Sequence, residues 1–233
     1  MVTYRPAAER GLTRSNWLRS YHSFSFNTYF DPRHMQFGPL RVLNDDYVDA
    51  GAGFPMHAHR DMEILTWVVE GTLEHRDSTG GQGIIRPGEL QRMTAGRGVR
   101  HSEFNHSQDE SLRLLQIWIL PDENGLDASY EQQSFDPSLW HNSFYELASG
   151  AGGEGSITIN QDVRMFIVQL DQGIEASRGL SQERGAYVFT IDGSLTVNGQ
   201  PVTTGDAVML EREREIRIQS ETGGSVLLFD LPL

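Results

Sequence analysis

Short apolar stretches alternate with turn residues along the whole chain. The stretches are rich in Val, Ile, Leu and aromatic residues, and Gly or Pro lies near most of their ends. Stretches of this length and composition, bounded by turn residues, are typical of β-strands. The clearest examples are Glu63–Glu70, Leu112–Leu120, Arg164–Leu170, Tyr187–Ile191 and Ser225–Leu231.

Helical periodicity is weak throughout the sequence. The chain contains no convincing long amphipathic segment, and short helices are expected only at places such as Trp17–Ser20 and Pro137–Trp140. Many short strands with regularly spaced turn signals favour an all-β sandwich or barrel.

The two halves of the chain share a pattern of acidic residues next to glycine. In each half a strand-like stretch ends in an acidic residue and Gly, and a later Gly-acidic pair precedes the next strand. The first half has Glu70-Gly71 and Gly88-Glu89, and the second has Asp192-Gly193 and Gly205-Asp206. Glycine suits tight turns and bulges because it adopts positive φ. The pattern therefore predicts a duplicated fold, with two unrelated hairpins as the alternative.

A glycine-rich segment divides the chain unequally. Ser149–Ser156 is small, polar and rich in Gly, as a flexible connection would be. We therefore predict an N-terminal domain over residues 1–148 and a C-terminal domain over residues 149–233, each of a size that can form a domain.

Composition excludes several classes of function. The chain has 233 residues, with 19 basic against 32 acidic residues and a formal net charge of −13. Such an acidic protein is a poor candidate for direct contact with nucleic acid or an anionic membrane. Lys and Cys are absent, which excludes Schiff-base chemistry, thiol catalysis and Cys-based metal sites. No apolar run approaches the ~20 residues of a membrane helix, so a cytoplasmic protein is expected.

Two pairs of residues carry the candidate chemistry. The eight histidines all lie at or before position 141, and they include the pair His57/His59, while His101 is paired with Glu103. Residues i and i+2 of a strand point to the same face, so each pair can direct two ligands into one barrel. Imidazole and carboxylate donors suit Fe, Zn, Cu, Ni, Mn or Co.

The neighbourhood of the first pair resembles the cupin signature. Gly51, His57, His59 and Glu63 follow its first motif, and Gly71 falls one residue late. The second cupin motif places a His after Pro-x-Gly, and Gln91 stands at that position here. The missing imidazole is expected to come from His101.

With this departure, the sequence resembles a narrower family, the pirins, and in particular the bacterial two-barrel pirins with quercetin 2,3-dioxygenase activity. The similarity is dense from about residue 17 to residue 133. The stretches that carry it are His22–Phe26, Tyr29–Pro32, Arg41–Asp46, Gly53–Phe54, His57–Arg60, Met62–Glu63, Pro87–Gln91, Met93–Gly98, His101–Glu103 and Gln116–Trp118.

The resemblance implies a bicupin, with two jelly-roll β-barrels and a few short helices. Carried over to this chain, the metal ligands are His57, His59, His101 and Glu103, and the metal is Fe(2+). The C-terminal domain is then a cupin-like barrel without metal ligands.

The function that the resemblance implies is cleavage of a flavonol such as quercetin with O2. Glu103 would both bind the metal and accept the substrate hydroxyl proton, while Gln116 or Glu63 would orient an imidazole. An alternative is a metal- or redox-sensing protein that binds a protein partner without catalysis, and another is an enzyme of the same class with a different substrate.

The remaining candidates are expected to have structural roles. His75 and His106 are predicted in solvent-facing loops. Phe24 and Phe26 are predicted to share one face and to pack in the core, with a flavonoid pocket as the less favoured reading.

Overall fold

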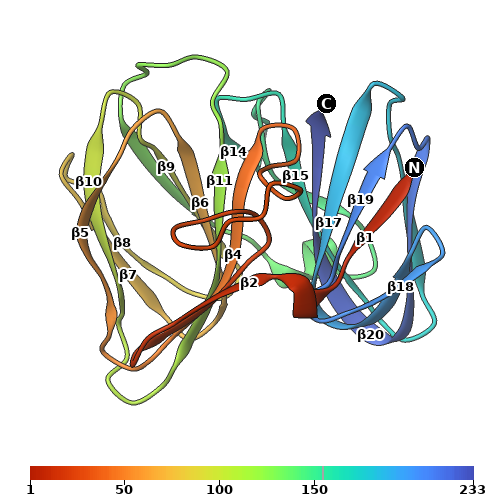
Figure 1. The fold of residues 1–233 in the computed structure, drawn as a ribbon, viewed down its shortest axis with the longest axis horizontal. Helices are drawn as coiled ribbons and strands as arrows, with labels where there is room; N and C mark the ends of the chain where they lie inside the picture. The colour runs from red at the N-terminus through yellow and green to blue at the C-terminus, as the bar shows by residue number, and fades with distance from the viewer. Residues whose placement is uncertain (154) are drawn as a thin grey trace.

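The computed structural model describes residues 1–153 and 155–233, and residue 154, inside the predicted connection Ser149–Ser156, lies outside the described residues. The fold is nearly all β and forms two barrels that lie side by side, as Figure 1 shows. The predicted bicupin architecture is confirmed by this arrangement.

Two facing sheets form the first barrel. The smaller sheet has the order β5 (Gly53–His59), β10 (Val99–Asn105), β7 (Leu73–Asp77) and β8 (Gln82–Ile85). The larger sheet has the order β12 (Ser129–Ser134), β9 (Glu89–Thr94), β6 (Glu63–Glu70), β11 (Leu112–Ile119), β4 (Leu40–Val48), β3 (Leu18–His22) and β2 (Gly11–Arg14).

One nine-stranded sheet forms the second barrel. Its strands follow the order β1 (Val2–Arg5), β19 (Ala207–Glu211), β17 (Arg184–Val197), β20 (Glu215–Pro232), β15 (Arg164–Leu170), β13 (Tyr145–Ser149) and β14 (Ile157–Thr158). In addition, β16 (Glu175–Gly179) pairs with β20, and β18 (Gln200–Thr203) pairs with β17. Irregular register near Asp192 and Gly193 bends the long β17 as it pairs with β20.

The predicted strands agree with the structure. Glu63–Glu70 and Arg164–Leu170 match β6 and β15, and Leu112–Leu120 exceeds β11 by one residue. The other two predicted strands lie inside β17 and β20, which continue past their bends.

Short helices occur at two places. The predicted helix Pro137–Trp140 is a 3-10 helix, η2, and a second, η1, covers Ala7–Glu9. The predicted helix Trp17–Ser20 is wrong, because Leu18–His22 forms β3, in which Ser20 and His22 point inward. A stretch this short cannot establish helical periodicity. Within the described ranges, no helix is long and apolar enough to cross a membrane.

The N-terminal segment connects both barrels. β1 pairs with β19 of the second barrel, whereas β2 pairs with β3 of the first (Figure 1). The expected boundary at residues 148 and 149 lies at the end of β13, a strand that pairs with β15. The division into residues 1–148 and 149–233 stays a prediction.

A continuous apolar layer joins the barrels. It contains residues from the outer faces of both, such as Phe24, Leu115 and Ile117 from the first and Tyr187 and Phe229 from the second. A buried polar contact crosses the same layer: the Arg113 guanidinium donates to Asp45 Oδ1 at 2.9 Å and to the Ile191 carbonyl at 3.0 Å. The interface between the two barrels is therefore a buried apolar layer, like the core of a single domain.

Equivalent glycines support the predicted duplication. Gly71 and Gly193 have φ of 82° and 86°, and Gly88 and Gly205 have φ of 85° and 84°. These left-handed conformations are unfavourable for residues with a Cβ, so the shared acidic-glycine pattern marks the same backbone turns in both barrels.

Two glycines with similar φ allow a test of the bend in β17. A Cβ on Gly193 would lie 2.2 Å from the Gly223 carbonyl oxygen, whereas a Cβ on Gly199 (φ 84°) would meet nothing within 4 Å. We expect Gly199→Ala to lower the free energy of unfolding by about 1–2 kcal/mol, the cost of left-handed backbone alone. Gly193→Ala should lower it by roughly 3 kcal/mol or more, because the facing backbone must also move. Urea unfolding measures both, and equal losses would contradict the close approach.

Candidate metal centre

The four predicted ligands lie together inside the first barrel. β5 carries His57 and His59, and its neighbour β10 carries His101 and Glu103. The antiparallel register places His101 directly opposite His57. The register shifts between His101 and Glu103, as at a β-bulge. The Glu103 carboxylate therefore lies near His101, further along β10.

Three imidazole rings face one another at short range. Nε2 of His57 lies 3.0 Å from Nε2 of His101. The ring centroids of His59 lie 4.8 Å from those of His57 and of His101. One nitrogen from each ring can be chosen so that all three lie within 4.8 Å of one another.

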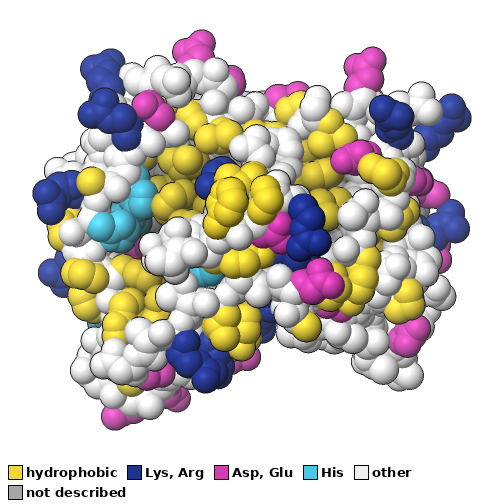
Figure 2. Space-filling view, in the orientation of Figure 1, with side chains coloured by type: hydrophobic (Ala, Val, Ile, Leu, Met, Phe, Trp, Pro, Cys, Tyr) yellow, Lys and Arg dark blue, Asp and Glu magenta, His cyan; other side chains and the backbone are white. Residues whose placement is uncertain are grey.

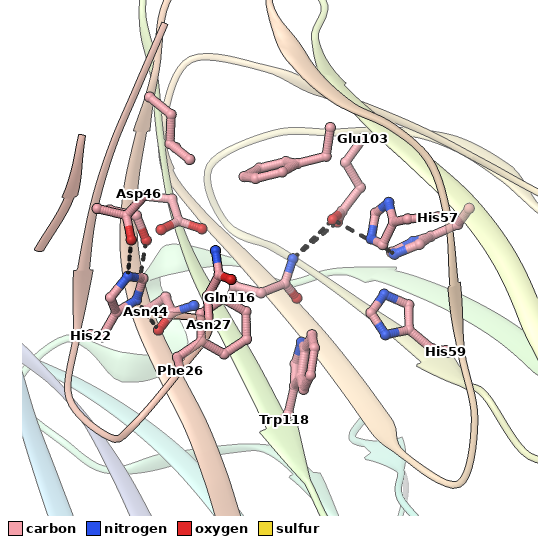
Figure 3. A pocket seen from close by; sticks show the side chains of 15 residues that line it. His22, Phe26, Asn27, Asn44, Asp46, His57, His59, Glu103, Gln116 and Trp118 are labelled. Atoms are coloured by element: carbon pink, nitrogen blue, oxygen red, sulfur yellow. Dashed lines mark hydrogen bonds and ion pairs between the residues drawn. The ribbon is translucent and has the colours of Figure 1, made fainter. Parts of the chain in front are cut away.

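The Glu103 carboxylate lies beside His101, in a second group that also contains His75. Oε2 of Glu103 lies 3.9 Å from Nε2 of His101, and the Glu103 side chain is buried. Figure 3 shows Glu103 on the side of the pocket that also carries His57 and His59. Three imidazole nitrogens and one carboxylate oxygen suit a divalent transition metal. The residues present therefore fit the metal that the sequence resemblance implies.

Two of the histidines, His59 and His101, are in the neutral form that can coordinate metal. Burial, reinforced by neighbouring histidines, lowers the pKa of His59 to about 4. The same two causes lower the pKa of His101 to about 3. Both imidazoles are therefore neutral at pH 7, with a lone pair available on one nitrogen.

Backbone and side-chain partners select which nitrogen is free. Nδ1 of His57 lies 2.8 Å from the Pro55 carbonyl, so Nδ1 carries the proton and Nε2 is left as the donor to a metal. Nδ1 of His101 lies 3.4 Å from Nδ1 of His75, and Nε2 of His101 faces the centre. Such contacts fix the tautomer and the orientation of a ligating imidazole.

His75 is not in a solvent-facing loop, and that prediction is wrong. It lies on β7, where Leu73 and His75 alternate inward, and its side chain is fully buried. Its Nε2 donates to Asp77 at 3.1 Å, which leaves the one lone pair of Nδ1 to accept from the Gln91 amide at 3.2 Å, with Nδ1 of His101 3.4 Å away. The inward alternation that begins at Leu73 is the sequence signal that could have located it. By contrast, the predicted exposure of His106 is confirmed.

Gln91 stands where the cupin pattern has a metal-binding histidine. Here its amide supports the His75 ring that in turn contacts His101. His75 also lies near Glu103, yet both of its ring nitrogens are already engaged. Gln91 is therefore not at the histidine cluster itself but contacts it through His75.

The Glu103 carboxylate is held by two neighbours. The Gln116 amide donates to its two oxygens at 3.2 and 3.0 Å, and the Thr66 hydroxyl donates at 3.3 Å. The prediction that Gln116 or Glu63 orients an imidazole is wrong, because Gln116 holds the carboxylate. Glu63 is buried elsewhere: it accepts from Thr94 and from the backbone of Asn160, both at 3.2 Å.

A cavity of about 110 Å³ opens beside the four side chains. Phe54, Phe26 and Trp118 contribute flat apolar walls, and the Trp118 ring lies 4.9 Å from that of His59. The expectation that Phe24 and Phe26 share one face is wrong, because Phe24 packs on Tyr187 of the second barrel. Figure 2 shows histidine atoms among hydrophobic side chains over the first barrel.

Family profiles and sequence relatives both relate this chain to pirins and quercetinases. A family profile described as Pirin matches residues 5–119, and one described as Quercetinase C-terminal cupin domain matches residues 146–231. A protein named quercetin 2,3-dioxygenase from Escherichia coli K12 is 42% identical over 232 residues, which cover 100% of this chain and 99% of the relative.

Solved structures agree with these sequence relatives. YhhW from Escherichia coli superposes with a TM-score of 0.96 at 42% identity, over 100% of this chain and 98% of that one. The bacterial pirin YhhW in complex with nickel(II) gives 0.95 at 41% identity, over 100% and 99%. A quercetin 2,3-dioxygenase from Acinetobacter baumannii, at 22% identity, shares the fold with a TM-score of 0.80 over 99% of this chain and 79% of that one.

The lowered histidine pKa values predict how the stability of the metal-free protein depends on pH. Because the pKa values of folded His59 and His101 lie below the ordinary 6.5, the unfolded chain binds more protons between about pH 4 and 6.5. The free energy of unfolding should therefore fall as pH falls through this window, by at most about 1.4 kcal/mol per pH unit for each histidine.

Urea unfolding of chelator-treated protein at about pH 7 and about pH 5 measures this loss. His59→Gln should show a weaker dependence on pH than the natural chain. Histidine NMR signals that titrate near the ordinary value for both residues would contradict the assignment.

Proposed function

The chain belongs to the pirin family, and from this premise we propose that it is a metal-dependent dioxygenase that cleaves a flavonol such as quercetin with O2. The observation that carries the proposal is the cluster of His57, His59 and His101 beside an aromatic-walled cavity, with the Glu103 carboxylate 3.9 Å from His101. The names of its whole-length relatives support the same reaction class.

We propose that these four side chains hold one divalent transition metal, with Fe(2+) as the ion. The nickel(II) complex of the related YhhW supports a divalent metal in this family. When bound, the metal supplies Lewis acidity and redox capacity for chemistry with O2.

The side chains around the metal site have separable tasks. Phe26, Phe54 and Trp118 offer flat surfaces on which an aromatic substrate packs and from which water is displaced. In this proposal Glu103 accepts the proton of a substrate hydroxyl. The Gln116 amide, which donates to both Glu103 oxygens, keeps the carboxylate directed at the cavity.

Removal of one imidazole tests the metal site. We expect the natural chain to bind about one metal ion and His101→Ala to retain roughly a tenth of that or less, because the lost nitrogen is central to the set. His106→Ala is the matched control, since the His106 ring is 54% exposed and contacts Glu74. Elemental analysis beside circular dichroism gives both metal content and fold. Stoichiometric metal in folded His101→Ala would overturn the ligand assignment.

Turnover tests the reaction itself. Metal-loaded protein should consume quercetin in air, with loss of flavonol absorbance, and should not do so under argon. Glu103→Gln should lower kcat per bound metal by roughly 10²-fold to 10⁴-fold, because an amide does not accept the proton. Metal content and thermal unfolding of this variant are measured in the same preparation. Absence of aerobic turnover at full metal occupancy would refute the dioxygenase proposal.

A further inference from the structure

The cavity has a second polar wall that the metal site does not use. Asp46 lies there with His22 and Asn44, on the side away from the histidine cluster (Figure 3). These residues come from β3 and β4 in the larger sheet, whereas the proposed ligands come from β5 and β10 in the smaller one.

Strand register explains how this wall is formed. Ser20 on β3 lies opposite Asp46 on β4, and His22 lies opposite Asn44. Asn44 in turn lies opposite Gln116 on β11, the residue that holds Glu103. Because residues two apart on a strand lie on the same face, the side chains of Asn44 and Asp46 both point into the barrel.

His22 and Asn44 are already satisfied by protein partners. Nδ1 of His22 lies 2.8 Å from Oδ1 of Asn44, and Nε2 lies 2.8 Å from the Thr13 hydroxyl. These contacts use both ring nitrogens. His22 and Asn44 therefore form a rigid polar surface around the neighbouring Asp46.

Asp46 differs from these neighbours. Its side chain is 3% exposed, and Oδ1 is a buried atom with no hydrogen-bond partner in the described part of the chain. An unsatisfied buried polar atom costs about 1–3 kcal/mol, so it requires an explanation in a native fold. Because Asp46 lines the cavity, a ligand bound there is the available source of the missing polar partner.

The surroundings of Asp46 define the ligand class. Burial raises the pKa of Asp46 to about 7. The Ser20 hydroxyl opposes this rise, and the acidic neighbours Asp45 and Glu103 add to it. Near neutral pH such a carboxyl group can either donate or accept a hydrogen bond. The same cavity is also lined by Leu18, Phe26 and Phe54, which favour a flat, uncharged ring.

We propose that Asp46 binds a hydroxyl group on the part of an aromatic substrate remote from the metal, so that the cavity selects polyhydroxylated aromatic compounds. This inference rests on the proposed function, because it takes the His57, His59, His101 and Glu103 end as the reacting end. It makes Asp46 a determinant of substrate selectivity rather than of the chemical step.

The test compares two flavonols that differ in their outer rings. Quercetin carries hydroxyl groups on both outer rings, and 3-hydroxyflavone carries none. The natural chain should favour quercetin in kcat/KM, and Asp46→Leu should reduce that preference by roughly tenfold to a hundredfold, the equivalent of one lost hydrogen bond. Asp46→Asn, which still donates and accepts, should keep most of the preference.

Two controls separate this role from a general effect on the fold. Asp49→Leu changes an exposed acidic residue just after the same strand and should leave the preference unchanged. Asp46→Ala replaces Asp46→Leu if the larger side chain prevents folding. Thermal unfolding is measured for each variant.

Binding under argon separates the inference from the proposed reaction. Quenching of protein fluorescence gives Kd for the same two compounds without turnover. Selective binding of quercetin that depends on Asp46, with no turnover in air, would support this inference and refute the dioxygenase proposal. An unchanged preference in folded Asp46→Leu, in either binding or turnover, would overturn the role of Asp46 and leave the reaction untouched.

Discussion

The antiparallel pairing of β5 with β10 is the constraint on which the rest of the site depends. It sets His57 opposite His101, so that two imidazole nitrogens lie 3.0 Å apart, and the irregular register that follows brings Glu103 to the same centre. A slip of one residue would turn every one of these side chains to the opposite face of the sheet. The two apolar clusters inside the first barrel oppose such a slip, since Leu73 and Ile85 belong to one and Val99 belongs to the other.

Between those apolar clusters, the larger sheet presents a row of polar residues to the smaller one. Adjacent strands place neighbouring members of the row opposite one another, in the order His22, Asn44, Gln116, Thr66 and Gln91. Three members of the row form hydrogen bonds to side chains of the smaller sheet: Gln116 and Thr66 contact Glu103, and Gln91 contacts His75. The interior of the second barrel is instead an apolar cluster that includes Phe166, Val188 and Leu228. The duplicated fold therefore has one barrel organised around polar groups and one organised around packing.

Part of this could be predicted from the sequence, because it depends on local alternation. The two i, i+2 pairs indicated which side chains share a face, and strand-length apolar runs located β6, β11 and β15. His75 and Asp46 were not identified as parts of the site, because their importance comes from strands that are distant in the sequence. His75 matters because β7 lies beside β10, and Asp46 matters because β4 faces the cavity. Phe26 was misplaced for a similar reason, since the chain turns after β3 and separates it from Phe24.

The path of the first residues has a consequence for how the protein can be divided. β1 completes the edge of the sheet in the second barrel at β19, and the chain then crosses to form β2 in the first. A fragment containing only the second barrel would expose the backbone of β19 as an open edge, which is a template for pairing with another chain. Cutting the gene between the two repeats would therefore yield an aggregation-prone product. In evolution, any exchange of the second barrel between proteins would also have to transfer β1, which lies at the start of the chain, before the first barrel.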